Sequence, residues 1–355
     1  MQDSRAPSSD QLRNWLRPVW TGRAIADESV FFVVGDDGVG AAPLLATPRG
    51  RVQLRSADGA TEYVEGRDFR VDGRHLRLLP GTRIPARTVA ELHPPPGAPN
   101  SIAASRDGKT HLYFGEGHFW HDQQCAASYR HRGDGALPVP ASARRQLPRF
   151  AARIARREPV RLVALGDSIT AGGNASGRTG ARPWMPAWPE LVAWALADRT
   201  KAGFELVNLA VGGMSSPWGL ERAPACIDAK PDLMWIAFGM NDASGRRPAG
   251  EFADTVLRTV DAVRAKVPTC EFVLVAGMTG NSEWVHSAPE LYDAYRDALA
   301  RRVGDGIALA DVTTVWKAVA ARKSWLDLTG NGVNHPNDFG HRLYASTVLA
   351  TLGCD

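Results

Sequence analysis

The chain has 355 residues, of which 44% are hydrophobic and 23% charged, with a formal net charge of +4. This length favours two domains over one, and the composition is typical of a globular protein with a large core. No apolar run reaches the roughly 18 residues that a membrane helix needs, so we expect no membrane span.

The start of the chain and its cysteines leave the compartment open. The first residues, MQDSRAPSSDQLRNWL, lack the charged and apolar regions of a signal peptide. The protein is therefore either cytoplasmic or extracytoplasmic (secreted or periplasmic) after removal of a signal, and we take the second as the working expectation. The cysteines form no CxxC pair, which argues against a structural zinc site and leaves disulfides undecided. They are Cys125, Cys226, Cys270 and Cys354.

The first part of the chain predicts an all-β domain. Short strand-like runs alternate with turn signals such as Asp58-Gly59 and Asp72-Gly73, a pattern typical of a β-sandwich. The expected strands are residues 30–34, 43–47, 51–56, 61–64 and 76–79; a proline-rich loop (93–100) and a second β-like run (110–129) follow. We expect an accessory β-sandwich domain, jelly-roll-like, over residues 1–148.

Two histidines in the second β-like run are candidate metal ligands. His118 and His121 lie near Glu116 and Asp122, and their spacing would suit one face of a helix. The surrounding sequence predicts strand and loop instead, in which alternation would send the two rings to opposite faces. We therefore expect surface or interface residues here and no metal site.

A basic segment, residues 144–161, connects the two parts. Its sequence, RRQLPRFAARIARREPVR, would also suit a nucleic-acid-binding patch. The apolar Phe150, Ile154 and Val160 favour an amphipathic connector with a solvated arginine face, and no RNA- or DNA-binding signature accompanies it. We expect no nucleic-acid partner, and a second domain over residues 149–355.

The second part alternates strand-length apolar runs with helical stretches. This pattern predicts a parallel sheet with helices on both faces. The expected strands are residues 162–165, 204–209, 233–238, 272–276 and 307–310, and the expected helices are 188–197, 217–229, 252–267, 289–303, 312–322 and 339–352.

Three of these strands end at residues that suit acyl chemistry. Reactive groups of open α/β sheets lie just past the carboxyl ends of the strands. Ser168 follows the first strand, where the next helix directs free N–H groups at a developing negative charge. Gly213 follows the second and allows close approach of a backbone N–H, although, taken alone, a tight turn is the better explanation. Asn241 follows the third and offers an amide donor or, alternatively, a helix N-cap.

A histidine loop near the end of the chain supplies the expected base. His335 precedes a proline, which favours extended geometry before the last helix, whereas His341 falls in the first turn of that helix and is expected to be structural. Nucleophile, base and oxyanion donors together form the constellation for acyl transfer.

These segments resemble the four blocks of the SGNH (GDSL-type) hydrolase superfamily. The matching sequences are GDSIT at 166–170, Gly213 after VNLAVG, GMND at 239–242 and NHPNDFGH at 334–341. The resemblance covers about residues 158–353 and implies a three-layer α/β/α fold with a five-stranded parallel sheet. It also implies ester hydrolysis through an acyl-enzyme on Ser168, with His335 as general base. The oxyanion hole would consist of the N–H groups of Ser168 and Gly213 and the Asn241 side chain, and no cofactor is implied.

One position departs from the superfamily pattern. An Asp usually stands three residues before the catalytic His, but here that position is Gly332. Three orienting groups for His335 remain: Asp327 reaching across the loop, Asn331 or Asn334 as a neutral group, or a backbone carbonyl, which would make a Ser–His dyad. A dyad and a displaced Asp327 are favoured equally.

Tryptophans beside the strand ends bear on the substrate. The chain has 11 tryptophans, and flat aromatic faces stack on sugar rings or line acyl pockets, unless they pack in the core. Those near strand ends are Trp184, Trp188, Trp218 and Trp284. A β-sandwich followed by an SGNH domain looks like some carbohydrate esterases, so we expect a carbohydrate O-acetylesterase acting on a small ester or an acetylated glycan. The alternatives are a lipase or thioesterase, an acyltransferase to sugar hydroxyls, and a non-catalytic glycan-binding protein; the oligomeric state is left open.

Overall fold

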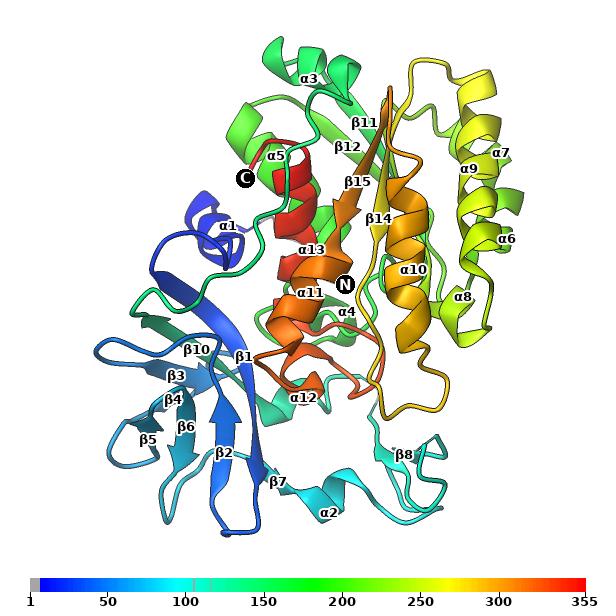
Figure 1. Ribbon diagram of the computed structural model, residues 1–355. Helices are drawn as coiled ribbons and strands as arrows, with labels where there is room; N and C mark the ends of the chain where they lie inside the picture. Colours follow the sequence, from blue (N-terminus) through cyan, green and yellow to red (C-terminus); the bar gives the residue numbers. More distant parts are fainter. Residues whose placement is uncertain (1–6, 105, 116) are drawn as a thin grey trace.

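The computed structural model describes residues 7–104, 106–115 and 117–355 (Figure 1). A β-rich region ends with strand β10 (Gln124–Arg130), and an α/β region begins with helix α3 (Pro148–Ala155). The expected fold class, a β-sandwich-like region before a parallel five-stranded α/β/α domain, is confirmed. The predicted boundary between residues 148 and 149 falls at the start of α3 and stays a prediction.

Five parallel strands form the centre of the α/β region, in the order β12-β11-β13-β14-β15. They are β11 (Val160–Gly166), β12 (Phe204–Asn208), β13 (Leu233–Ala237), β14 (Glu271–Ala276) and β15 (Ile307–Asp311). β13 and β14 are buried at every residue, as expected for a sheet covered on both faces. The chain leaves β11 for the edge strand β12 and returns to β13 on the other side. The carboxyl end of β11 is therefore the switch point, where ligands bind in open α/β sheets.

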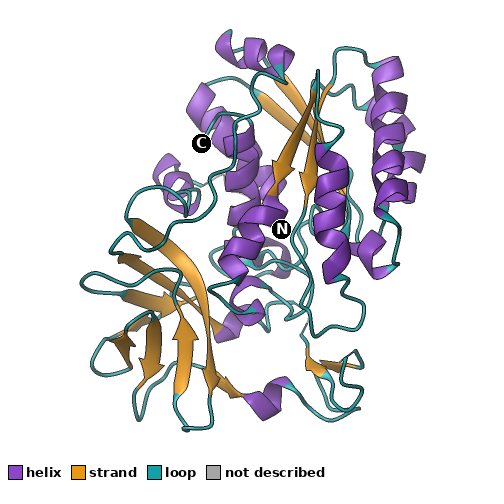
Figure 2. Cartoon of the chain, viewed as in Figure 1, coloured by secondary structure: helices purple, strands orange, loops and turns teal. Residues whose placement is uncertain are grey.

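Helices cover both faces of this sheet (Figures 1 and 2). On one side lie α5 (Trp188–Thr200), α11 (Val312–Ala320) and α13 (Asp338–Thr351); on the other lie α6 (Ser216–Glu221), α7 (Ala223–Asp228), α9 (Ala249–Lys266) and α10 (Pro289–Ala300). The helix expected at 217–229 is divided into α6 and α7, because Pro224 lacks an N–H and starts a new helix. Short helices in the loops were not predicted: α4 (Ser176–Thr179), α8 (Met240–Ser244) and α12 (Trp325–Leu328).

The β-rich region is a curved sheet in the order β4-β3-β10-β1-β2-β6-β5, with β7 beside β1. The long strand β1 (Ala24–Val34) pairs with β10, β2 and β7 along its length, and its register shifts between Ile25 and Glu28. The remaining elements are α1 (Ser9–Trp15), β2 (Gly40–Pro43), β3 (Gln53–Ser56), β4 (Glu62–Tyr63), β5 (Phe69–Asp72), β6 (His75–Leu78), β7 (Ala86–Thr88), α2 (Val89–Leu92), β8 (Ser101–Ile102) and β9 (Leu112–Tyr113).

Two strands expected in this region are wrong. Residues 44–47 follow β2 but are not a strand, because side chains satisfy their N–H groups: Leu45 donates to the Glu28 carboxylate and Ala46 to the Tyr129 hydroxyl. The run 110–129 is β9, a turn, the 3₁₀ helix η1 (His121–Gln123) and β10 rather than continuous strand.

The expected connector between the regions is confirmed as an amphipathic helix. α3 buries Phe150 and Ile154 and leaves Arg149 and Arg156 exposed. All four cysteines are free. None of the helices in the described ranges combines the length and the apolar character needed to cross a bilayer.

The two regions meet at a buried junction where charged side chains are packed. Lys323 lies between Glu28 of β1 and Asp327 of α12, at 3.8 and 4.0 Å, and its Nζ donates to the Pro43 carbonyl at 2.5 Å. Nearby, Arg342 of α13 donates to the carbonyl oxygens of Trp15, Ala26 and Asp27. Side chains of the α/β region thus hold the backbone of the β-rich region.

Candidate active site

Ser168 lies in a tight turn immediately after β11. A Cβ on Gly166 would come within 2.5 Å of the Ala237 carbonyl oxygen, so only glycine fits at the end of the strand. Asp167 Oδ1 accepts the Ile169 N–H at 3.0 Å, and the Ser168 carbonyl accepts the Gly173 N–H at 2.7 Å. These bonds fix the turn and leave the Ser168 side chain half-buried at the switch point.

His335 lies directly against Ser168. Its Nε2 is 2.8 Å from Ser168 Oγ, although the two residues are 167 positions apart in sequence. The loop that carries it is held by Asn331, whose Oδ1 accepts the N–H groups of Val333, Asn334 and His335 at 3.0 to 3.2 Å. The structure therefore brings the predicted nucleophile and the predicted base into hydrogen-bond contact.

The group that contacts the other nitrogen of His335 is none of the three expected candidates. Asn174 Oδ1 lies 2.7 Å from His335 Nδ1. Asp327 is used at the junction instead, where it accepts the N–H of Phe31 at 2.7 Å and caps α12. Asn331 holds the backbone, Asn334 accepts from Asn331 Nδ2, and the ring contact is a side-chain amide rather than a backbone carbonyl.

Asn174 was missed by the sequence analysis because its link to His335 spans 161 positions. A local signal exists: Asn174 follows two glycines and adopts a left-handed backbone, φ +59°, which Asn tolerates better than most residues. That signal identifies a turn after the nucleophile. It does not reveal that the side chain faces the base.

Burial keeps the two histidines of this cluster uncharged near neutral pH. It lowers the pKa of His335 to about 4, and it lowers the pKa of the neighbouring His341 to about 4. His341 Nε2 contacts the Gly173 carbonyl at 3.0 Å, in keeping with the structural role expected for it. Burial raises the pKa of Asp167 to about 7, with a smaller contribution from the negative charge of Asp242.

The loop after β12 lies against the nucleophile. A Cβ on Gly212 would come 3.6 Å from Ser168 Cβ, and Gly213 adopts φ +79°. Within the described part of the chain, the N–H groups of Ser168 and Gly213 make no hydrogen bond. Asn241 Nδ2 donates to the Met214 carbonyl at 2.8 Å, which leaves one of its two N–H groups for a ligand.

Asp242 joins the two loops that carry these donors, and the sequence analysis assigned it no role. Its carboxylate accepts the Ser216 N–H at 3.1 Å and the Ser216 Oγ–H at 2.6 Å. Arg247 Nε donates to the same carboxylate at 3.0 Å. The loop containing Gly213 is thereby fixed to the helix that carries Asn241.

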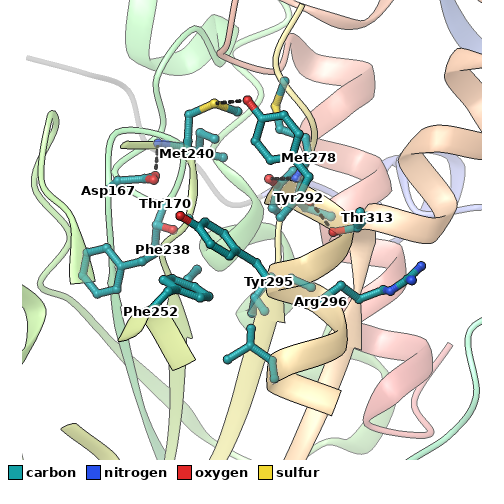
Figure 3. A pocket seen from close by; sticks show the side chains of 18 residues that line it. Asp167, Thr170, Phe238, Met240, Phe252, Met278, Tyr292, Tyr295, Arg296 and Thr313 are labelled. Atoms are coloured by element: carbon teal, nitrogen blue, oxygen red, sulfur yellow. Dashed lines mark hydrogen bonds between the residues drawn. The ribbon is translucent and has the colours of Figure 1, made fainter. Parts of the chain in front are cut away.

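A small cavity lies behind the nucleophile turn (Figure 3). Its volume is about 30 Å³, and its lining includes Asp167, Thr170, Met240 and Tyr292 but neither Ser168 nor His335. The Tyr292 hydroxyl points at the Met240 sulfur at 3.6 Å, and Thr170 Oγ1 is buried without a protein partner. The cavity has room for about one or two water molecules and is not the acyl pocket.

The candidate metal ligands have partners of their own. His118 Nδ1 contacts Asp122 Oδ2 at 2.7 Å on the surface, and His121 Nε2 donates to the Arg182 carbonyl at 2.7 Å. Glu116 lies outside the described residues. Across the ranges that the structure describes, no group of three or more His, Cys, Asp and Glu side chains is placed to hold a metal ion.

The four tryptophans near strand ends have different surroundings. Trp188 is fully buried against Trp235, and Trp218 and Trp284 pack on the core. Trp184 is 56% exposed and has a left-handed backbone, φ +62°, which is unusual for a bulky residue. It lies between α4 and α5, on the segment that connects β11 to α5 and also carries Ser168.

Several solved structures are similar to this chain in fold. A two-domain esterase active on acetylated mannans, co-crystallised with mannopentaose, aligns at 24% identity and a TM-score of 0.48, over 61% of this chain and 54% of that one. The alignment thus spans about half of that esterase. A putative GDSL-like lipase from Parabacteroides merdae aligns at 18% identity and TM-score 0.45 (55% and 96% of the chains). A carbohydrate esterase family 3 protein from Talaromyces cellulolyticus aligns at 17% and 0.41 (53% and 94%).

A search of curated proteins finds no match to this sequence. The model of the GDSL-like lipase/acylhydrolase family does match, over residues 164–343. This range is about half of the chain and includes the turn of Ser168, the loop of Gly213, Asn241 and the histidine loop. The resemblance stated from the four sequence blocks is confirmed, and the chain belongs to the GDSL-like lipase/acylhydrolase family, a family of ester hydrolases.

Proposed function

We propose that the chain is a serine esterase that removes short acyl groups, above all O-acetyl groups, from carbohydrate through an acyl-enzyme on Ser168. The observation that carries this proposal is the 2.8 Å contact between Ser168 Oγ and His335 Nε2, with burial keeping the imidazole neutral as a base requires.

The reaction uses these groups in two steps. His335 Nε2 takes the Ser168 proton as Oγ bonds to the ester carbonyl carbon, and the oxyanion accepts the N–H groups of Ser168 and Gly213 and an Asn241 N–H. His335 then donates its proton to the departing sugar hydroxyl as the ester C–O bond breaks. Water repeats the sequence on the acyl-enzyme, which releases the carboxylic acid and returns the proton to Ser168.

The carbohydrate part of the proposal is supported by Trp184. Its exposed indole lies after α4, on the segment between β11 and α5 that also carries Ser168 and Asn174, and flat aromatic faces stack on sugar rings. Replacing Trp184 with Ala should raise the KM for an acetylated glycan several-fold and leave kcat/KM for nitrophenyl acetate unchanged. An equal loss on both substrates would argue for a structural role of this side chain.

The test of the chemistry is Ser168→Ala with nitrophenyl acetate as substrate. We expect at least about a 10⁴-fold loss of kcat, and a phosphonate ester should label Ser168 of the wild type in a peptide mass spectrum. Unchanged turnover in the variant would remove the esterase proposal and leave the glycan-binding alternative. Preference for decanoyl over acetyl esters would favour the lipase or thioesterase, and acyl transfer to added glycan in excess of free acetate would favour the acyltransferase.

A further inference from the structure

We infer that Asn174 is the positioning residue of the base: a neutral side-chain amide, in place of a carboxylate, holds His335 in the tautomer that accepts the Ser168 proton. The inference rests on the proposed function. It adds to that function the identity of the third group and the pH range in which the base works.

The orientation of the Asn174 amide is determined by two carbonyl oxygens. Its Nδ2 donates to the Gly330 carbonyl at 2.9 Å and to the Gly117 carbonyl at 3.4 Å. Rotating the amide by 180° would place Oδ1 against both carbonyl oxygens, with no proton between them. Oδ1 therefore faces His335 Nδ1, the position given by the 2.7 Å contact.

This orientation sets the tautomer of His335. Asn174 Oδ1 is only an acceptor, so Nδ1 must carry the proton of the neutral ring. Nε2 is then unprotonated and faces Ser168 Oγ at 2.8 Å, as a general base requires. The other tautomer would bring a lone pair against Oδ1 and a proton against the nucleophile.

Glycines on both sides make room for this arrangement. A Cβ on Gly330 would lie 2.4 Å from Asn174 Cβ, and a Cβ on Gly173 would lie 3.0 Å from His335 Nδ1. Gly330 also donates its N–H to the His335 carbonyl at 2.9 Å, so one segment holds both the amide and the base. Gly117 belongs to the β-rich region, which therefore contributes to the position of the base.

The charge around the ring agrees with a neutral partner. Among the described residues, no carboxylate contacts His335; its ring nitrogens meet Ser168 and Asn174, and the neighbouring titratable group is His341, buried and uncharged near neutral pH. A carboxylate at position 174 would stabilise the imidazolium and keep the base protonated to higher pH. The amide avoids this, so kcat/KM of the wild type should stay level from neutral pH down to about pH 5.

Two variants separate this role from simple packing. Asn174→Ala should lower kcat/KM by about 10²–10⁴-fold, because the tautomer is no longer fixed. Asn174→Asp keeps the shape and the acceptor but introduces a carboxylate, so it should regain most of the activity at about pH 8–9. The acid limb of its pH profile, where kcat/KM falls as His335 is protonated, should move upward by about one to three pH units. Asn208→Asp, which changes an amide that donates to the Thr170 carbonyl, serves as a matched amide-to-acid control and should leave the limb in place.

The tautomer can also be measured without turnover. In ¹⁵N-histidine spectra of the folded wild type, the Nδ1–H form of His335 should dominate, and the Nε2–H form should increase in Asn174→Ala. An Nε2–H wild type, or an acid limb that does not move in Asn174→Asp, would overturn the inference. Failure of the proposed function is a different result: Ser168→Ala would then keep its activity whatever tautomer His335 has.

Discussion

The domain junction and the active site both bury polar side chains, but they differ in charge. At the junction, Lys323 lies between the carboxylates of Glu28 and Asp327. In the chain of contacts from Ser168 through His335 to Asn174, no member is charged near neutral pH. Asp327, the one carboxylate among the candidate partners of His335, thus joins two parts of the molecule instead of orienting the base.

The difference in charge follows from what the junction and the active site each require. At the junction, charged partners fix one way of packing β1 against α12, and Asp327 accepts the N–H of Phe31 from the opposite region. Buried pairs of this kind add little stability by themselves but are sensitive to the loss of one partner. At the site, a base must stay neutral when burial surrounds it, and an amide orients it without adding charge.

The largest expected effect is the loss of folding stability when the charges of the junction are left unbalanced. Lys323→Met leaves Glu28 and Asp327 buried without a cation, and we expect the free energy of unfolding to fall by about 3–5 kcal/mol. Urea unfolding measures this. Lys317→Met is the control: Lys317 is half-exposed on α11 and pairs with Asp293, so its loss should change stability by less than about 0.5 kcal/mol. Equal, small changes in both variants would mean that the junction does not depend on its charges.

The next effect concerns the geometry of the site. Gly330→Ala should displace Asn174, because the new Cβ would lie 2.4 Å from Asn174 Cβ. A shift of about 1 Å in the group that holds the base should lower kcat about 100-fold. Gly250→Ala is the matched control, since nothing lies within 4 Å of that position in α9. If kcat of Gly330→Ala equals that of the control, the uncharged contact chain does not position the base.

Much of the fold and part of the site could be predicted from the sequence. Three strands of the parallel sheet are followed by Ser168, Gly213 and Asn241, so local pattern and topology together locate this edge. Residues 44–47 resist such prediction, because their N–H groups find side chains distant in sequence rather than a neighbouring strand. Asn174 and Asp327 resist it for a related reason: Asn174 meets His335, 161 positions away in sequence, and Asp327 meets Phe31 of the other region.

A third effect, spread gradually over the range from about pH 4 to 7, tests whether Asp167 is protonated beneath the nucleophile. The folded pKa of Asp167, about 7, lies above its ordinary value, so the folded protein keeps a proton that the unfolded chain loses. Its contribution to stability is complete below about pH 4 and is lost as pH rises through 7, by up to about 1.4 kcal/mol per pH unit. Asp167→Asn removes this loss. The difference between the two unfolding curves should grow from pH 4 to 7 and then level off; a flat difference would mean that Asp167 is ionised in the fold.

The smallest expected effect is on the turnover of Asp327→Asn, and it distinguishes the two regions most directly. Asparagine keeps one acceptor for the N–H of Phe31 but removes the negative charge near Lys323, so unfolding should become easier by about 1–3 kcal/mol. The kcat of the folded variant, normalised by phosphonate titration of Ser168 well below its melting temperature, should stay within about threefold of the wild type, because Asp327 does not contact His335. If Asp327 oriented the base, the same change would lower kcat by about 10⁴-fold. A loss of that size without loss of stability would move Asp327 from the junction to the catalytic machinery and remove the contrast between the two regions.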